Sequence, residues 1–292
     1  FSVIRQLQYS KTNKSLALDL AIFINGLPMI TMELKNSLTY QSYRDAIHQY
    51  KNDRDPKDLL FQFKRAIVHF ALDDNEIYFC TKLAGKSSWF LPFNKGQENA
   101  GGNPPNPNGI KTDYLWKKIF EKRELSNIIE NYAQVVEELD NETKKKKEKQ
   151  IFPRYHQWDV VKKLLAHVYE NGVGNKYLIQ HSAGSGKSNS IAWTAHQLVS
   201  LEKEGKNLID SVLVVTDRIN LDKQINETIG QFVQVGSTVG HAEYSADLTK
   251  LIQEGKKIII TTVHKFSFIL DEIGTRHRGS RFAILIDEAH SS

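Results

Sequence analysis

Two carboxylates and a lysine near the N-terminus are the residue types of a metal-dependent hydrolase. Asp19 lies in the apolar segment LALDLAIFI, and Glu33 and Lys35 lie in MITMELK. The Asn-Gly turn between these segments predicts a hairpin of two strands, which could bring both carboxylates to one side. Carboxylates repel each other without a cation, and Mg²⁺ takes oxygen ligands. We therefore expect a magnesium site on Asp19 and Glu33.

Lys35 would complete this site. Side chains alternate along a strand, so Lys35 shares a face with Glu33. From there its ammonium could orient a water or steady the pentavalent phosphate during metal-assisted phosphodiester hydrolysis. The alternative is a solvated strand face, because Glu-x-Lys also occurs in polar stretches at 142–144, 204–206 and 254–256. The spacing alone leaves both interpretations open.

A glycine-rich stretch in the second half of the chain has the chemistry of a phosphate site. HSAGSGKSNS follows the apolar segment KYLIQ, and His181 stands where a P-loop usually has its first glycine. The glycines let backbone N–H groups turn toward phosphate oxygens, and the following helix aims its N-terminus at the anion. Lys187 supplies charge for the β and γ phosphates, and Ser188 offers a hydroxyl to Mg²⁺. The expected ATP-binding core is Gly184, Ser185, Gly186, Lys187 and Ser188.

An acidic pair at the end of a later strand would complete the ATP site. Asp287 and Glu288 end the apolar segment FAILIDE. Active sites of parallel sheets lie at the carboxyl ends of their strands. We expect Asp287 to hold Mg²⁺, directly or through water, and Glu288 to polarise the attacking water.

The elements that position these residues form an α/β chain with two regions. Before residue 143, short strands alternate with helical segments, and DYLWKKIFEKRELSNIIENYAQVV is predicted to be helical. After residue 151, the runs KYLIQ, SVLVVTD, KIIITT and FAILIDE are apolar on both faces, which is typical of a buried parallel sheet. The lysine-rich stretch between them predicts an exposed linker over residues 144–150.

Composition limits the class of protein. With 292 residues, 40 % hydrophobic and 25 % charged, the chain has the composition of a soluble globular protein of about two domains. No run approaches the roughly 18 apolar residues of a membrane span, and no signal peptide is evident. The single cysteine, Cys80, excludes an internal disulfide and fits a reducing cytoplasm. A net charge of +5 is compatible with nucleic-acid binding but does not establish it.

The motifs after residue 151 resemble those of superfamily 2 helicases and translocases. DEAH begins at Asp287, and FPRYHQ resembles the family's adenine-reading motif, which implies Gln157 as the adenine contact. VVTDRINLDKQ and TTVHKF resemble the segments that track the DNA backbone; a strand followed by a helix start is the structural alternative. The resemblance implies DNA-backbone contacts by Thr216, Arg218, Thr262 and Lys265.

The first region resembles a nuclease. Asp19 followed by Glu33-x-Lys35 is similar to the PD-(D/E)xK core, and a nuclease of that kind joined to a DEAH-box motor resembles the restriction (R, HsdR) subunit of type I restriction-modification enzymes. Segments 65–96 and 112–116 also resemble this family, in its order. The resemblance implies an endonuclease domain over residues 1–143 and the first RecA-like motor domain over residues 151–292.

The function implied by this resemblance is ATP-driven DNA translocation coupled to Mg²⁺-dependent double-strand cleavage of unmodified DNA. The implied cofactors are Mg²⁺ and ATP. The implied partners are double-stranded DNA and the methyltransferase and specificity subunits, in the cytoplasm and without a membrane. The family also has parts expected before Phe1 and after Ser292, including a second RecA-like domain with an arginine finger. The chain alone is therefore expected to bind ATP but to hydrolyse it poorly.

Two alternatives remain. A stand-alone helicase or remodeller would use its N-terminal domain only to grip DNA, and a non-catalytic assembly module would hold ATP as a structural ligand. The family often has Gln-x-x-x-Tyr after the Glu-x-Lys strand; here Gln49 is followed four residues later by Asp53. Gln49 is thus either a contact of the nuclease site or of DNA, or a polar residue on an exposed helix face.

Overall fold

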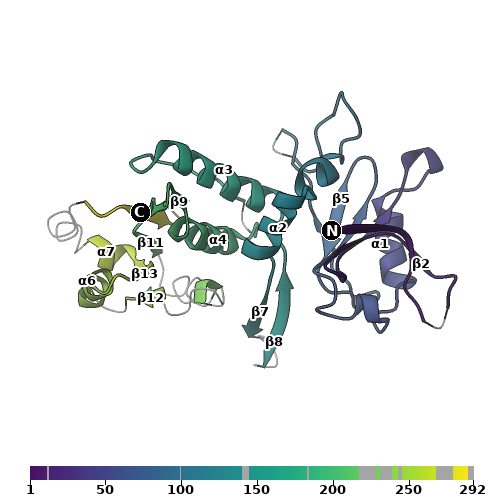
Figure 1. The fold of residues 1–292 in the computed structure, drawn as a ribbon, viewed down its shortest axis with the longest axis horizontal. Coiled ribbons are helices and arrows are strands. Elements are labelled where there is room, and N and C mark those ends of the chain that lie inside the picture. Colours follow the sequence, from purple (N-terminus) through teal and green to yellow (C-terminus); the bar gives the residue numbers. More distant parts are fainter. Residues whose placement is uncertain are drawn as a thin grey trace. The chain divides into compact units, whose positions relative to one another are not determined.

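The chain folds into two compact units, Phe1–His156 and Gln157–Ser292, each with its own sheet (Figure 1). The structure is a computed structural model. The residues that it describes are 1–11, 13–98, 100–139, 145–182, 184–216, 228–230, 239–242, 245–267 and 279–288.

The first unit is built on a six-stranded sheet in the order β1-β2-β3-β4-β5-β6. Neighbouring strands are antiparallel except β3 and β4, which run parallel. The parallel pair needs a crossover, and α1 lies in that connection. The strands are β1 (Ser2–Gln8), β2 (Ala17–Ile24), β3 (Leu27–Leu34), β4 (Val68–Leu72), β5 (Ile77–Cys80) and β6 (Leu91–Pro92).

The predicted hairpin is confirmed, since β2 and β3 pair in antiparallel fashion. Asn25 and Gly26 have φ angles of 51° and 80°. A two-residue turn with positive φ at both positions matches the twist of the strands, which explains the Asn-Gly sequence. The register then shifts by one residue at a β-bulge between Ile22 and Phe23.

Helix α1 (Tyr43–Asn52) covers one face of this sheet and packs against β3 and β4. It begins at a capping box, in which Ser42 and Asp45 each bond the other's backbone N–H. The opposite face carries an aromatic cluster in which Phe70 contacts the rings of Phe93, Phe120 and Phe152. The other helical turns of this unit are η1 (Ser37–Thr39), η2 (Leu59–Phe61), the π-helical η3 (Leu115–Ile119) and α2 (Lys122–Asn131).

The segment predicted as a linker is instead part of a β-hairpin. Strand β8 (Lys146–Ile151) pairs with β7 (Gln134–Leu139), and residue 144 lies outside the described residues. The Gln150 side chain donates to the carbonyl oxygen of Ala66 at 2.8 Å, which holds β8 to the first unit. A charge run shows the solvated side chains but not the pairing of the backbone beneath them. The two units accordingly divide between residues 156 and 157, not at 144–150.

Strand β7 also corrects the helical prediction for residues 113–136. Helix α2 ends at Asn131, and the last residues of the predicted helix begin β7 at Gln134. Val135 and Val136 are β-branched, and such side chains pack well on a pleated surface.

The second unit contains the predicted parallel sheet, in the order β12-β13-β11-β14. Strands β11 and β13 are fully buried, as their apolar sequences require. The strands are β11 (Ser211–Thr216), β12 (Val239–His241), β13 (Ile258–Thr262) and β14 (Phe282–Ile286), with a small hairpin of β9 (Glu202–Lys203) and β10 (Lys206–Asn207).

The helices of the second unit pack around this sheet. Helix α4 contacts β11, β13 and β14, and α6 contacts β12 and β13. No helix in the described part of the chain is long and apolar enough to cross a membrane. The helices are α3 (Tyr155–Asn171), α4 (Lys187–Val199), α6 (Ser245–Gln253) and α7 (Val263–Ser267).

One predicted strand of this unit is wrong. KYLIQ (residues 176–180) pairs with no strand in the described part of the chain, and Leu178 is 89 % exposed. A strand needs a neighbour whose backbone groups face its own. Among the described strands, the sheet ends at β14, and none pairs with this segment. The apolar residues of this segment therefore favour a strand, but the segment pairs with no described strand.

Candidate active sites

The first candidate site begins with the two carboxylates of the β2–β3 hairpin. On the side of the bulge away from the Asn-Gly turn, Leu20 pairs with Met32. The same register, continued by one residue, puts Asp19 opposite Glu33. Directly opposite residues share a face, with Cβ atoms about 4.5–5.5 Å apart. The Asp19 Oδ2 accepts from the backbone N–H of Leu34 at 2.9 Å, which fixes this carboxylate at the edge of the pair.

Glu33 is a buried carboxylate, and only one of its two oxygens accepts a hydrogen bond from the described residues. Its Oε1 accepts from Nε of Arg54 at 2.6 Å and forms an ion pair with Nη2 of the same guanidinium, also at 2.6 Å. Its Oε2 is buried and has no hydrogen-bond partner among the described residues. Burial raises the pKa of Glu33 to about 7; Arg54 opposes this shift, and the nearby carboxyl of Asp19 adds to it. The charge of Asp19 therefore influences the protonation of Glu33.

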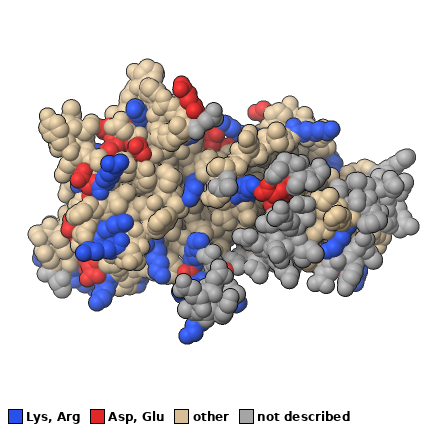
Figure 2. All heavy atoms as spheres, turned by 180° about the vertical axis from the view of Figure 1, so that it is seen from behind, with Lys and Arg blue, Asp and Glu red and all other residues tan. Residues whose placement is uncertain are grey.

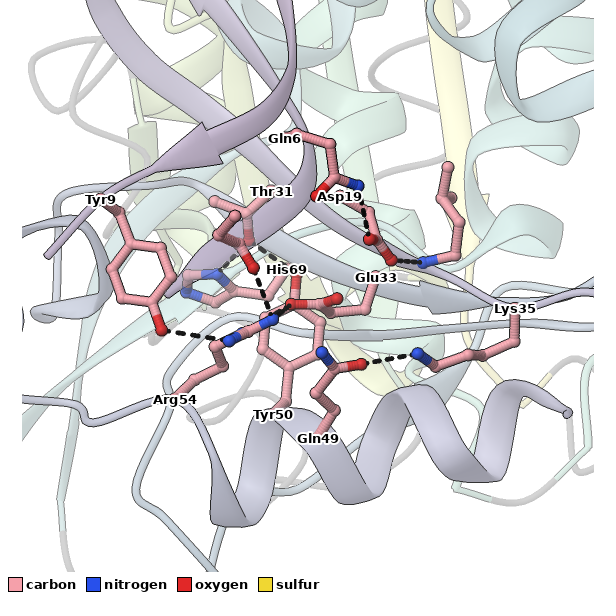
Figure 3. Close-up of polar contacts among 12 residues, drawn as sticks. Gln6, Tyr9, Asp19, Thr31, Glu33, Lys35, Gln49, Tyr50, Arg54 and His69 are labelled. Atoms are coloured by element: carbon pink, nitrogen blue, oxygen red, sulfur yellow. Dashed lines mark hydrogen bonds and ion pairs between the residues drawn. The ribbon is translucent and has the colours of Figure 1, made fainter. Parts of the chain in front are cut away.

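Lys35 and Gln49 meet on the same side of the sheet (Figure 3). The Lys35 Nζ donates to Gln49 Oε1 at 2.7 Å. Helix α1 is held at this depth by its next residue, because the Tyr50 hydroxyl lies 2.9 Å from Thr31 Oγ1, which lies 2.7 Å from His69 Nδ1. Burial lowers the pKa of His69 to about 3, so its ring is neutral in this triad. Gln49 is thus half-buried and in contact with Lys35, and does not lie on a fully exposed helix face.

The donor set of this site suits a magnesium ion held by few protein ligands. In the described ranges, no group of three or more His, Cys, Asp or Glu side chains could hold a metal ion. Mg²⁺ commonly uses one or two carboxylates and completes its octahedron with water and substrate phosphate. Asp19 and the buried Oε2 of Glu33 fit this pattern, since a cation there would satisfy an oxygen that has no described partner.

The second candidate site lies around the start of α4. Gly184 and Gly186 have φ angles of 71° and 85°, a region that glycine adopts without strain, and Lys187 begins the helix. The Gln157 side chain donates to the Gly186 carbonyl oxygen at 2.9 Å. A Cβ at Gly186 would collide with that amide. Gln157 and the glycine-rich loop are therefore in contact; Ser185 lies in that loop, and Ser188 lies in the first turn of α4.

The acidic pair lies at the end of β14 and faces this loop. The backbone N–H of Asp287 donates to Val215 at 2.9 Å, which continues the pairing with β11. The Lys187 Nζ makes an ion pair with Glu288 Oε1. Burial raises the pKa of Asp287, Glu288 adds to the shift, and Lys187 opposes it. Lysine, aspartate and glutamate thus converge on the start of α4.

The structure describes three of the four residues predicted to contact the DNA backbone. Thr216 and Thr262 are buried at the ends of their strands. The Lys265 Nζ donates to the carbonyl oxygen of Ala242 at 3.0 Å. Arg218 lies outside the described residues, as does His290 of the DEAH motif.

Comparison with known proteins matches this division of the chain. The family model described as the N terminus of the type I restriction enzyme R protein (HSDR_N) matches residues 1–88, and that of the SWI2/SNF2 ATPases matches residues 156–292. A putative type I restriction enzyme MjaVIIIP endonuclease subunit of Methanocaldococcus jannaschii is 24 % identical over 99 % of this chain and 29 % of its own length. The HindI endonuclease subunit of Haemophilus influenzae is 25 % identical over 94 % of this chain and 26 % of its own.

The chain is HsdR-like. A third relative, the SauMSSORF170P endonuclease subunit of Staphylococcus aureus, is 24 % identical over the whole HsdR-like chain and 29 % of its own length. The HsdR-like chain thus spans less than a third of the length of these relatives. It combines a type I R-subunit N-terminal region with an SNF2 ATPase-like region, and the predicted α/β fold with a parallel-strand sheet is confirmed.

Sequence reasoning missed two residues that contact the carboxylates of the HsdR-like chain. Arg54 binds Glu33 from the segment after α1, and Gln6 Nε2 donates to Asp19 Oδ1 at 3.1 Å from β1. Gln6 has a φ of 50°, which is rare for a residue other than glycine. Neither residue belongs to a motif, so no spacing in the sequence pointed to them.

Proposed function

We propose that this chain carries the nuclease centre and the first motor unit of a type I restriction R subunit. In this proposal, ATP-driven translocation is coupled to Mg²⁺-dependent double-strand cleavage of unmodified DNA. The observation that carries it is the convergence of Asp19, Glu33, Lys35 and Gln49 from three elements, with a buried carboxylate oxygen of Glu33 that lacks a partner in the described structure.

The residues of the first unit have distinct roles in this proposal. Asp19 and Glu33 would hold Mg²⁺, which supplies Lewis-acid stabilisation of the scissile phosphate. Lys35 would donate to the attacking water or to a phosphate oxygen as negative charge develops. Gln49 accepts from Lys35 at 2.7 Å and so limits the directions in which this ammonium can point. Asp19 and Glu33 lie on the sheet and Gln49 lies on α1, whereas Lys35 directly follows β3, where its backbone N–H donates to Leu72 at 2.9 Å.

The residues of the second unit would bind ATP. Gln157 would contact adenine, the loop from Gly184 to Ser188 would hold the phosphates, and Asp287 with Ser188 would hold their Mg²⁺. The ion pair between Lys187 and Glu288 joins two groups that the nucleotide would separate. Phosphate oxygens would become the partners of Lys187, and Glu288 would then accept from the attacking water.

DNA and the methyltransferase and specificity subunits are the proposed partners. On the face shown in Figure 2, lysines and arginines are spread over the coloured surface with acidic groups beside several of them. The charge visible there does not form one continuous basic patch. The proposal of DNA as substrate therefore depends on the chemistry of the first candidate site and not on surface charge.

The test is cleavage of unmethylated supercoiled plasmid by the whole protein with its methyltransferase partner, Mg²⁺ and ATP. Lys35→Ala should stop cutting while ATP hydrolysis continues. Lys57→Ala, which removes an exposed lysine of the same unit, is the matched control and should cut like the wild type.

A Lys35→Ala protein that cuts normally would overturn the nuclease assignment. The chain would then be better described as a DNA motor or remodeller whose first unit grips DNA. The match of residues 156–292 to SWI2/SNF2 ATPases keeps that second function in view.

A further inference from the structure

Arg54 is a buried cation beside the proposed nuclease centre that neither motif includes. It lies just after α1, and its side chain is 4 % exposed. Its Nη1 donates to the Tyr9 hydroxyl at 3.1 Å, and its Nη2 donates to the carbonyl oxygen of Ala17 at 2.9 Å. The guanidinium carbon also lies 5.4 Å from the centroid of the Tyr9 ring. Arg54 is thus fixed by groups from three parts of the first unit.

Its contact with Glu33 uses one carboxylate oxygen. An arginine and a carboxylate often form two parallel bonds, one to each oxygen. Here Nε and Nη2 both reach Oε1 at 2.6 Å, and Oε2 is left without a hydrogen bond in the described part of the chain (Figure 3). A buried carboxylate oxygen without a partner has lost its hydration and gained no hydrogen bond in return, which is unfavourable. Such an arrangement is favourable when a ligand completes it.

The direction of Oε2 is set by what surrounds it. Glu33 is directly opposite Asp19 in the hairpin register, and Arg54 occupies the other oxygen. We propose that Arg54 is a positioning residue, which fixes Glu33 through Oε1 so that only Oε2, beside Asp19, is presented to a divalent cation. This inference rests on the proposed nuclease function and deepens it, because it assigns Glu33 a single metal-facing oxygen.

A purely structural role for Arg54 makes a different prediction. If Arg54 only neutralised a buried charge, its loss would lower the thermal stability and leave the chemistry of each folded molecule unchanged. If Arg54 positions Glu33, its loss would release the carboxylate to turn, and the cation would bind without being held in the productive place. A 1 Å misplacement of reacting groups lowers a rate by about a hundredfold.

The experiment separates cation binding from cleavage in the same variants. Binding of Mn²⁺ alone is followed by the electron paramagnetic resonance signal of the free ion, without ATP or DNA. Cleavage by the whole protein in its complex is then measured at saturating Mn²⁺. The variants are Arg54→Met, Arg54→Lys, Glu33→Gln and, as a matched control, Arg44→Met, which removes an exposed arginine of α1.

Arg54→Met should lower the cleavage rate without weakening Mn²⁺ binding. Mn²⁺ should bind at least as tightly as in the wild type, because a positive charge has left the surroundings of the ion. The cleavage rate at saturating Mn²⁺ should fall about tenfold to a hundredfold, because Glu33 is no longer held. Arg54→Lys should restore part of the rate, since an ammonium can still bond Oε1. Arg44→Met should match the wild type in both measurements.

The outcomes distinguish this inference from the proposed function. If Glu33→Gln loses one Mn²⁺ and stops cutting, while folded Arg54→Met cuts at the wild-type rate, Arg54 is structural and the inference is wrong. If Glu33→Gln keeps its Mn²⁺ and cuts normally, the nuclease function itself is wrong. If Arg54→Met does not fold, Arg54→Lys decides: a reduced rate with retained Mn²⁺ binding supports positioning, and a wild-type rate overturns it.

Discussion

The two candidate sites hold their lysines in opposite ways. In the first unit, Lys35 donates to the neutral Gln49, and Glu33 accepts from Arg54, so neighbours hold the lysine and the carboxylate separately. In the second unit, Lys187 pairs directly with Glu288, although each has its own expected role in ATP hydrolysis. If the proposed function holds, the first site can take up its substrate with the present contacts kept, whereas at the second site ATP would have to replace Glu288 as the partner of Lys187.

This difference indicates at which site the side chains would have to change partners when the substrate binds. In the proposed mechanism, a nucleotide phosphate replaces the carboxylate of Glu288 beside Lys187 before Glu288 polarises the water. At the first site, a cation and a phosphate can add to side chains whose directions are already fixed by packing. We therefore expect substitutions in the second unit to affect every ATP-dependent step, and substitutions in the first unit to affect cleavage alone.

The largest effect is expected from Lys187→Ala. Removing the ammonium takes away the charge that faces the β and γ phosphates and should lower ATP turnover by about a hundredfold or more. Translocation and cleavage by the whole complex should be lost with it. The measurement is steady-state ATP hydrolysis on unmethylated DNA. Lys206→Ala changes an exposed lysine of the same unit and should hydrolyse ATP normally. Unchanged turnover in Lys187→Ala would refute the ATP site.

Asp19→Ala tests the other side of the comparison. Loss of this carboxylate should remove cleavage, by about a hundredfold or more, because one of the two protein ligands of the cation is gone. ATP hydrolysis should be spared. Both rates are measured on the same plasmid, and Asp53→Ala, at the exposed end of α1, serves as control. An equal fall in ATP hydrolysis would show that the two sites are coupled or that Asp19 is structural.

Gln49→Ala sharpens the comparison with a smaller change. Lys35 would keep its charge and lose the acceptor 2.7 Å away, and a hydrogen bond to a charged group contributes about 1.5–3 kcal/mol. We expect cleavage to fall about tenfold, with the Mg²⁺ concentration for half-maximal rate nearly unchanged. Gln49→Glu, which keeps an acceptor, should recover part of the rate. His48→Ala, on the exposed side of α1, should have no effect. A wild-type cleavage rate in Gln49→Ala would mean that Lys35 does not need the hydrogen bond from its ammonium to Gln49.

The same comparison explains what the sequence could predict. The glycine-rich loop is one contiguous stretch in which each residue type suits phosphate binding, so an ATP site could be predicted from it without knowledge of the fold. The carboxylate pair depends on register. Without the bulge between Ile22 and Phe23, Asp19 would lie opposite Met32 instead of Glu33. Sequence spacing contains no sign of such a bulge.

Long-range partners were equally invisible in the sequence. Arg54 reaches a carboxylate 21 positions earlier, and the lysine run of β8 pairs with β7. Periodicity and composition report on each segment alone, whereas these contacts need two segments to be placed together. For the same reason, KYLIQ was predicted as a strand from its own residues.

The smallest effect concerns the stability of the first unit and not its activity. His69 is buried against Thr31, and burial lowers its pKa to about 3 from an ordinary 6.5. Below pH 6.5 the unfolded chain binds a proton that the folded chain excludes, so stability falls as the pH falls. The slope is about 1.4 kcal/mol per pH unit for one proton, or about 2 kcal/mol between pH 6.5 and pH 5. Hydrogen exchange of the α1 amides measures this locally.

The wild-type curve alone would mislead, because Glu33 acts in the opposite direction. Its pKa is raised to about 7, so its contribution to stability falls as the pH rises from about 4.5 to 7 and partly cancels that of His69. The difference between the wild type and His69→Gln isolates the histidine, since an amide can still bond Thr31. That difference should shrink with acid, whereas His48→Gln, which changes an exposed histidine of α1, should follow the wild type at every pH. A difference that does not change with pH would mean that His69 takes up its proton inside the folded unit, and the Tyr50–Thr31–His69 triad would then not hold α1 through a neutral ring.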